Sequence, residues 1–127
     1  MQNIVTQPKG FTGSITTADL HLTPNAKYLY ISNRDITARF EPTGRDSIVG
    51  FQVDPQNGRL KLISHTPCER VPRSFTIGKL GQFLYVAGQT DNRLGAYRIE
   101  PNGTLKKIAQ YEVGKGPIWV ETLSLPK

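Results

Sequence analysis

The order of short apolar segments in this sequence repeats, and the repeat limits the fold more than any other feature. Residues 28–31 match residues 83–86, and the longer stretch 51–63 matches residues 97–108. In both copies of the longer stretch an apolar segment is followed by an acidic residue, Pro and Gly. A period of roughly 40–50 residues with room for four short strands is typical of β-propeller blades and not of a sandwich.

The segments between the turns favour β-strands. Their lengths and their enrichment in Val, Ile, Tyr, Phe and Leu suit strands, and several alternate in polarity with a period of two. Twelve Gly and nine Pro are spread through the 127 residues, and no window keeps the apolar stripe of an amphipathic helix. We therefore expect an all-β chain, with strands in residues 27–32, 47–53, 82–87 and 94–99.

Two turn sequences mark expected hairpins. Residues 54–58 and 100–103 each combine Pro with Asn-Gly. Pro presets φ for the first turn position, and Asn-Gly supplies the positive φ that a tight hairpin needs.

Dividing the chain by this repeat predicts a β-propeller fragment of about two and a half four-stranded blades, whereas closed propellers have 4–8. We therefore expect an arc of a larger ring, or a chain that closes only by assembling. Open blades leave strand edges and apolar faces uncovered, which favours self-association. The predicted units are outer strands of a preceding blade (1–17), a blade at 18–66 lengthened by an insertion at 36–46, a blade at 67–112, and the inner strand of a closing blade (113–127).

Charge and composition restrict the partners. The formal charge of +6 favours anionic ligands. The basic residues are spread from Lys9 to Lys127, so we expect no nucleic-acid partner. No run approaches the ~20 apolar residues of a membrane span, and residues 1–5 lack the features of a secretory signal. These observations predict a cytoplasmic protein without membrane contact.

The sequence offers little for a metal or a cofactor. Cys68 is the only cysteine, which excludes an internal disulfide and a cysteine-cluster metal site. It lacks a nearby His or basic helix start, so we expect an inert thiol. Two distant histidines without an acidic cluster make a poor metal site, and the dinucleotide and phosphate-loop motifs are absent. We expect no metal and no cofactor.

Four ordered motifs resemble one known family. They are residues 18–30, 71–75, 83–89 and 113–120, the last containing Gly-Pro-Ile-Trp-Val. In this order they are similar to the carboxy-terminal part of the bacterial 6-phosphogluconolactonase family, which is related to the fungal muconate-lactonizing enzyme. The resemblance implies a seven-bladed propeller whose innermost strands line a central channel. It also implies cofactor-free hydrolysis of 6-phospho-D-glucono-1,5-lactone to 6-phosphogluconate in the pentose phosphate pathway.

Asp19 and His21 are the candidate catalytic residues. They stand two apart on an expected strand, so both side chains point to one face. A carboxylate beside an imidazole fixes its tautomer and raises its basicity, which suits activation of water. The alternative is structural, with Asp19 tying a neighbouring blade and His21 donating to a backbone carbonyl. Aligning the inner strands places Asp19 level with Arg73.

Two arginines are candidate substrate-binding groups. Arg73 follows Pro72, at a Pro-Arg pair that the resembling family also has. It is predicted to hold a phosphate or to stabilise the oxyanion of lactone opening, with a salt bridge to Asp19 as the alternative. Arg34 is predicted either to bind substrate or to pair with Asp35 or Asp91 at the surface.

Gln89, Lys115 and Trp119 are further candidates. Gln89 is predicted to bind substrate hydroxyls or to serve as a structural amide in its turn. Lys115, between two glycines, is predicted to attract a phosphate or to remain a solvated lysine. Trp119 is predicted to pack between blades, with stacking on a sugar ring as the alternative.

These residues leave three functions open. The first is a lactonase whose general base lies in blades outside this chain, so that the chain alone is inactive. The second is a non-catalytic propeller module that binds a partner, because fold does not fix function. The third is a lactonizing enzyme acting on another carboxylated substrate.

Overall fold

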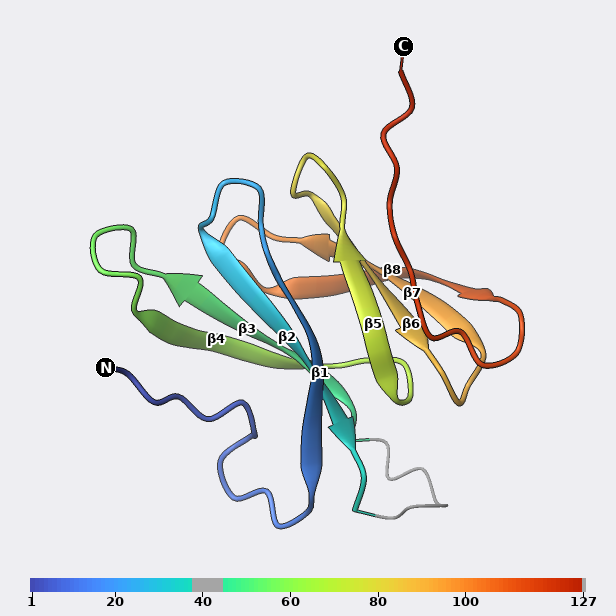
Figure 1. Ribbon diagram of the computed structural model, residues 1–127, viewed down its shortest axis with the longest axis horizontal. Helices are drawn as coiled ribbons and strands as arrows, with labels where there is room; N and C mark the ends of the chain where they lie inside the picture. The colour runs from blue at the N-terminus through green and yellow to red at the C-terminus, as the bar shows by residue number, and fades with distance from the viewer. Residues whose placement is uncertain (38–44, 127) are drawn as a thin grey trace.

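The computed structural model describes residues 1–37 and 45–126, and it contains two antiparallel sheets of four strands each (Figure 1). The all-β prediction is confirmed. The strands of the first sheet pair in the order β1-β2-β3-β4, and those of the second in the order β5-β6-β7-β8. No helix long and apolar enough to cross a membrane occurs in this part of the chain. The strands are β1 (Ile15–Leu22), β2 (Tyr28–Asp35), β3 (Ser47–Val53), β4 (Leu60–Pro67), β5 (Pro72–Ile77), β6 (Phe83–Gly88), β7 (Arg93–Ile99) and β8 (Leu105–Glu112).

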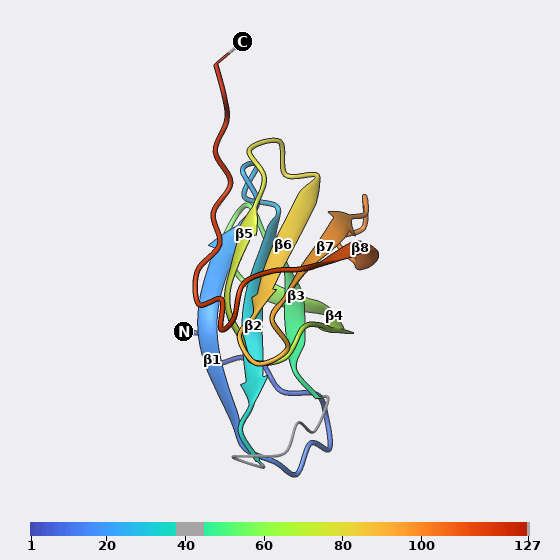
Figure 2. The same cartoon turned by 90° about the vertical axis from the view of Figure 1, so that its right-hand side faces the viewer.

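The two sheets fan out from their inner strands, β1 and β5, and pack face to face (Figures 1 and 2). Each strand alternates its side chains between the two faces of its sheet, and one face of each sheet supplies the apolar core between them. This is the stacking of neighbouring propeller blades that the repeat predicts. The buried members of this core are Tyr28, Tyr30, Ile48, Phe75, Leu84, Val86 and Tyr97.

The predicted hairpin turns are confirmed, and one of them joins the sheets. Gly58 and Gly103 have φ values of 70° and 83°, which a residue with a Cβ rarely adopts. The Tyr28 hydroxyl donates to the carbonyl of Pro101 at 2.6 Å, and the Tyr30 hydroxyl donates to that of Gly103 at 2.8 Å. A Cβ on Gly103 would come within 2.6 Å of the Tyr28 ring. Glycine is therefore required there both by the turn and by the packing.

The strand register corrects the predicted alignment of the inner strands by one residue. Leu20 of β1 pairs with Ile31, and Phe75 of β5 pairs with Val86. Ile31 and Val86 are equivalent residues of the repeat, so Leu20 and Phe75 are equivalent too. Asp19 therefore corresponds to Ser74, and not to Arg73. Both strands have a bulge at this point, and a bulge breaks the alternation on which such an alignment depends.

Residues 1–14 and 113–126 contain no strand; each segment makes hydrogen bonds to a sheet, and the C-terminal end extends away from both sheets (Figure 1). Asn33 Nδ2 donates to the carbonyl of Thr6 at 2.7 Å, and the Val120 amide donates to Ser74 Oγ at 3.3 Å. The strands expected at 1–17 and 113–127 stay predictions, except that β1 already begins at Ile15. The insertion predicted at 36–46 falls largely on positions 38–44, which lie outside the described residues.

Apolar side chains stay exposed on β1 and on the chain after β8. Leu20 and Leu22 are 61% and 52% exposed, and Trp119 is 71% exposed. The prediction that Trp119 packs between blades is therefore not met by the two sheets described. Self-association through such surfaces stays a prediction.

Candidate functional site

A pocket of about 270 Å³ lies between the inner strands, near the start of β1 and β5. The two sheets form opposite sides of it, and the segment after β8 adds a third wall. Its lining includes four of the candidate residues, Asp19, Arg34, Arg73 and Trp119, so the fold brings together side chains that are far apart in the sequence. The lining residues are Thr17, Ala18, Asp19, Arg34, Arg73, Ile118 and Trp119.

The Asp19 carboxylate joins the two sheets. Its Oδ2 accepts a hydrogen bond from the Phe75 amide of β5 at 3.2 Å. Its Oδ1 accepts one from the Leu20 amide at 2.9 Å and lies 3.2 Å from Nε2 of His21. Both oxygens therefore accept a backbone hydrogen bond, and the carboxylate links β1 to β5.

The equivalent position of the second sheet makes the same kind of contact. Ser74 Oγ accepts from the amide of Val120, in the segment that follows β8. In both copies of the repeat, a side-chain oxygen of the inner strand thus accepts a hydrogen bond from the segment that follows its sheet: Asp19 of β1 binds β5, and Ser74 of β5 binds the chain after β8. This favours the structural alternative for Asp19.

His21 lies beside Asp19, as the two-residue spacing predicts, but it is not part of the pocket wall. Its ring packs edge-on against Phe75, with the ring centroids 4.9 Å apart and the planes at 82°. The imidazole therefore contacts the second sheet while 41% of its side chain stays exposed.

Arg73 reaches the pocket from the bulge at the start of β5. A bulge re-aims a side chain out of the regular alternation, and Arg73 is exposed while its neighbours Pro72 and Ser74 are buried. The alternative salt bridge to Asp19 is not among the ion pairs of the described residues. Its guanidinium thus remains available to an anion.

Arg34 lies across the pocket from β5, near the end of β2, and it too makes no ion pair within residues 1–37 and 45–126. The pairing expected with Asp35 or Asp91 is therefore not seen. Asp35 instead accepts from Arg45. Arg34 Nε is buried without a hydrogen-bond partner, and so is Oγ1 of Thr16, its register partner on β1.

Gln89 and Lys115 do not line the pocket. The backbone of Gln89 donates to the carbonyl of Val71 at 3.3 Å, a turn contact that continues the pairing of β5 with β6. Lys115 is exposed and is followed by Gly116, whose amide donates to Asn92 Oδ1 at 2.9 Å. Neither residue lies in the wall of the pocket between the inner strands.

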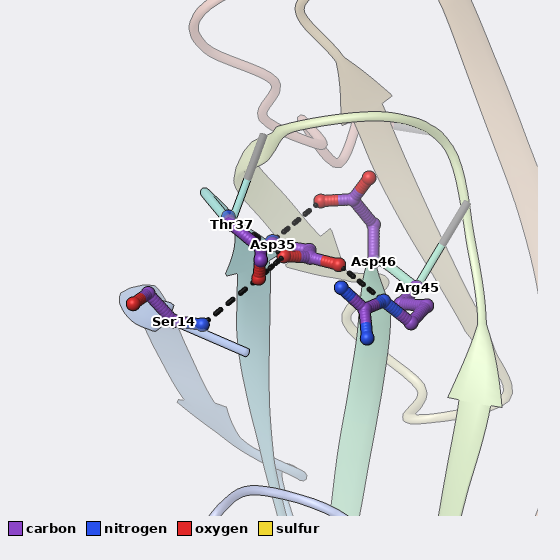
Figure 3. Close-up of polar contacts among 5 residues, drawn as sticks. All are labelled: Ser14, Asp35, Thr37, Arg45 and Asp46. Carbon is purple, nitrogen blue, oxygen red and sulfur yellow. Dashed lines mark hydrogen bonds and ion pairs between the residues drawn. The ribbon is translucent and has the colours of Figure 1, made fainter. Parts of the chain in front are cut away.

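A larger hollow of about 500 Å³ lies where residues 8–12 meet the first sheet, and two of its charged residues, Arg45 and Asp46, both contact Asp35. Arg45 Nε donates to Asp35 Oδ2 at 2.7 Å, and the Asp35 amide donates to Asp46 Oδ1 at 3.0 Å (Figure 3). Burial raises the pKa of Asp46 above its ordinary value. This network closes the end of the sheet, and no set of three metal-ligating side chains was found in the described chain.

Sequence analysis missed Glu69, a buried charged residue in the connection between β4 and β5. Its carboxylate accepts from Tyr97 Oη at 2.8 Å and from Lys107 Nζ, and it is 2% exposed. It occupies space left by Gly88 and Gly95, where an added Cβ would meet the Glu69 side chain. The two glycines on neighbouring strands are the signal that would have revealed it.

The thiol of Cys68 lies in this acidic region. Burial and the nearby Glu69, Asp46 and Asp91 carboxylates raise the pKa of the Cys68 thiol well above its ordinary value. A thiol that holds its proton is a poor nucleophile, which supports the prediction of an inert cysteine.

Comparisons with known proteins match this chain almost from end to end. The family model described as "Lactonase, 7-bladed beta-propeller" matches residues 1–122. A 6-phosphogluconolactonase of Pectobacterium carotovorum is 38% identical over 126 residues, which is 98% of this chain and 35% of that protein. A 6-phosphogluconolactonase of Yersinia pestis is 39% identical over 122 residues, which is 94% of this chain and 34% of that protein.

Solved structures share the fold. A Bacteroides fragilis protein, provisionally described as a 6-phosphogluconolactonase, superposes with a TM-score of 0.81 at 27% identity, over 98% of this chain and 32% of that chain. The periplasmic gluconolactonase of Pseudomonas aeruginosa has a TM-score of 0.78 at 28% identity, over 91% of this chain and 30% of that one. The chain thus spans about a third of the length of these relatives.

Proposed function

Because this chain belongs to the seven-bladed β-propeller lactonase family, we propose that it forms part of the substrate site of a 6-phosphogluconolactonase. The reaction is hydrolysis of 6-phospho-D-glucono-1,5-lactone to 6-phosphogluconate, a step of the pentose phosphate pathway. The observation that supports this most directly is the pocket in which Arg34 and Arg73 face the seam between two blades without an ion pair in the described chain.

Arg73 is the proposed phosphate-binding residue. Its guanidinium is exposed at the pocket and unpaired within the described residues, and a guanidinium can hold a phosphate with two parallel hydrogen bonds. Asp19, the one carboxylate among the described residues of the pocket wall, already accepts from two backbone amides. The pocket is therefore a net cationic site, as a phosphorylated substrate requires.

Water is the nucleophile in the proposed reaction, and its proton must pass to a base as it attacks the lactone carbonyl. Asp19 is hydrogen-bonded on both oxygens, and His21 packs on Phe75 outside the pocket wall. We therefore assign Asp19 a positioning role and place the base in a blade of the complete ring other than the two described. The chain by itself is then expected to bind the product without accelerating hydrolysis.

A chimera tests this proposal. The 126 residues of the Pectobacterium carotovorum enzyme that match this chain are replaced by this chain, and hydrolysis of freshly generated 6-phosphogluconolactone is measured above its spontaneous rate. We expect an active chimera, and a fall of about 100-fold or more in kcat/KM for Arg73→Ala, because one charge-assisted contact is worth several kcal/mol in a desolvated site. Arg93→Ala, at an exposed position of β7, is the matched control. Unaltered activity in the Arg73 variant would refute the phosphate-binding role.

The cytoplasm is the predicted compartment, and the periplasm is the alternative because one structural relative is a periplasmic gluconolactonase. Cell fractionation of the source organism with an antibody to this chain distinguishes the two.

A further inference from the structure

The inner strands of this chain form a series in which each member contacts the next. Phe75 of β5 lies against β1, where its ring packs on His21, and it is 0% exposed. Its equivalent in β1 is Leu20, because the two pair with equivalent residues of the repeat. Residues 1–14 contain no strand, and Leu20 is 61% exposed. Nothing in the described chain therefore covers Leu20 as β1 covers Phe75.

The other end of the series is the segment that follows β8. Its Val120 amide donates to Ser74 Oγ at 3.3 Å, as the Phe75 amide donates to Asp19 Oδ2 at 3.2 Å. Trp119 thus stands where β1 has Asp19 and β5 has Ser74, which is the position whose side chain reaches the next member of the series. The rest of the described chain forms no further strand, and Trp119 is 71% exposed.

The two ends of the series are both apolar and exposed. Leu20 and Leu22 alternate with His21, so they point away from the second sheet, and Leu22 is 52% exposed. At the opposite end, Trp119 is accompanied by Leu123, which is 83% exposed, in a segment that extends away from both sheets (Figure 1). Contact between opposite ends would bury both apolar surfaces. It would also repeat the kind of contact that β1 already makes with β5.

We propose that two copies of this chain associate head to tail, with Trp119 of each copy packing on Leu20 and Leu22 of the other. Each copy supplies three members of the series, namely β1, β5 and the segment that carries Trp119. Two copies therefore supply six, which lies within the 4–8 blades of closed propellers, whereas three copies would exceed that range. A head-to-tail contact ends in a ring when its rotation closes. This inference does not rest on the proposed function.

Sedimentation velocity of the 127-residue chain between about 1 μM and 1 mM tests the association. We expect a concentration-dependent species of twice the 14.1 kDa chain mass. Because Trp119 is the only tryptophan, its emission should shift to shorter wavelength over the same range. Leu20→Glu should raise the dissociation constant about 10- to 100-fold, the range for the lost burial of one leucine side chain. Leu80→Glu, at an 80% exposed position between β5 and β6, is the matched control and should change it less than about twofold.

A mixture of Leu20→Glu and Trp119→Ala chains separates a head-to-tail contact from a symmetric one. In a mixed pair, the intact Trp119 of the first variant meets the intact Leu20 of the second. The mixed pair should therefore bind more tightly than either variant binds itself. The second variant contains no tryptophan, so the emission shift reports the first variant alone. Circular dichroism spectra confirm that each variant is folded.

The outcomes decide the inference without touching the proposed function. It is overturned by a chain that sediments as a monomer throughout, by equal effects of Leu20→Glu and Leu80→Glu, or by a mixture that binds no more tightly than its components. A species heavier than two chains would refute the closed pair. None of these results bears on Arg73, whose phosphate-binding role is tested separately in the chimera.

Discussion

Tyr30 and Tyr97 provide a matched pair for measuring how much the buried Glu69 carboxylate stabilises the second sheet. Both side chains are 0% exposed, and both hydroxyls donate at 2.8 Å. Tyr30 donates to a neutral backbone carbonyl, whereas Tyr97 donates to the Glu69 carboxylate. Burial raises the pKa of both phenols, so each keeps its proton as a donor. Replacing either with Phe removes only the hydroxyl.

The two substitutions should differ in cost because the acceptors differ in charge. A hydrogen bond between neutral groups contributes about 0.5–1.5 kcal/mol to the free energy of unfolding, and one to a charged group about 1.5–3 kcal/mol. Tyr97→Phe also leaves one side of a buried carboxylate without its donor, and only Lys107 still pairs with it. We expect Tyr97→Phe to destabilise the chain by about 2–3 kcal/mol and Tyr30→Phe by about 1 kcal/mol.

Urea unfolding of the 127-residue chain, followed by circular dichroism at a single pH, measures both values. The m-values of the variants should match that of the unaltered chain, since the surface exposed on unfolding is the same. The double variant Tyr97→Phe/Lys107→Met should be non-additive, because both side chains bind one carboxylate. A loss in Tyr97→Phe no greater than that in Tyr30→Phe would show that the charge of Glu69 adds nothing to the stability of the second sheet.

Three further predictions follow from buried contacts. Gly95→Ala places a Cβ 2.1 Å from the Glu69 carboxylate and should lower the free energy of unfolding by about 1–3 kcal/mol. The control Gly114→Ala, where an added Cβ has nothing within 4 Å, should be nearly neutral. Equal urea midpoints for the two variants would contradict this. Burial raises the pKa of Asp46 above its ordinary value of 3.8 in the folded chain, so the folded state holds this proton longer and loses the associated stability as the pH rises above about 4. Asp46→Asn should therefore gain stability relative to the unaltered chain between about pH 4 and pH 7, and a pH-independent difference in unfolding free energy would disprove it. Asp19→Ser should lower stability by less than about 1 kcal/mol and leave 6-phosphogluconate binding intact in a titration that follows Trp119 fluorescence, because the equivalent position of the second sheet already uses a serine; loss of binding would restore a direct role for the carboxylate.

The architecture could be predicted from the sequence because every blade repeats the same physical solution. Apolar segments of strand length, separated by turns such as 54–58 and 100–103, define hairpins wherever they occur. The repeat then specifies which strands belong to one sheet. Glu69 escaped prediction because its burial depends on space left by two glycines of another strand pair, and a contact between distant segments leaves little trace in local sequence.

The site was only partly predictable. Asp19, Arg34 and Arg73 were singled out by residue type, and the fold does place them together. The surface ion pair expected for Arg34 failed, because local sequence could not reveal that its side chain lines a pocket while Arg45 takes the neighbouring carboxylate. Trp119 was expected between blades, yet it is 71% exposed and lines the pocket, because the segment after β8 that carries it forms no strand.

The bulge in each inner strand separates the positions that hold the ring together from those that face the ligand. In the observed strand register, Arg73 of β5 corresponds to Ala18 of β1. The Val120 amide donates to Ser74 as the Phe75 amide donates to Asp19, so Ile118, two residues before Val120, corresponds to Arg73. All three line the pocket. The residue that follows this position is Asp19 in β1 and Ser74 in β5. Its side-chain oxygen accepts a hydrogen bond from the backbone of the neighbouring segment. A charge can therefore be introduced at the first position without disturbing the contact made by the second, and this explains how one repeated scaffold can present Ala, Arg and Ile to the same pocket.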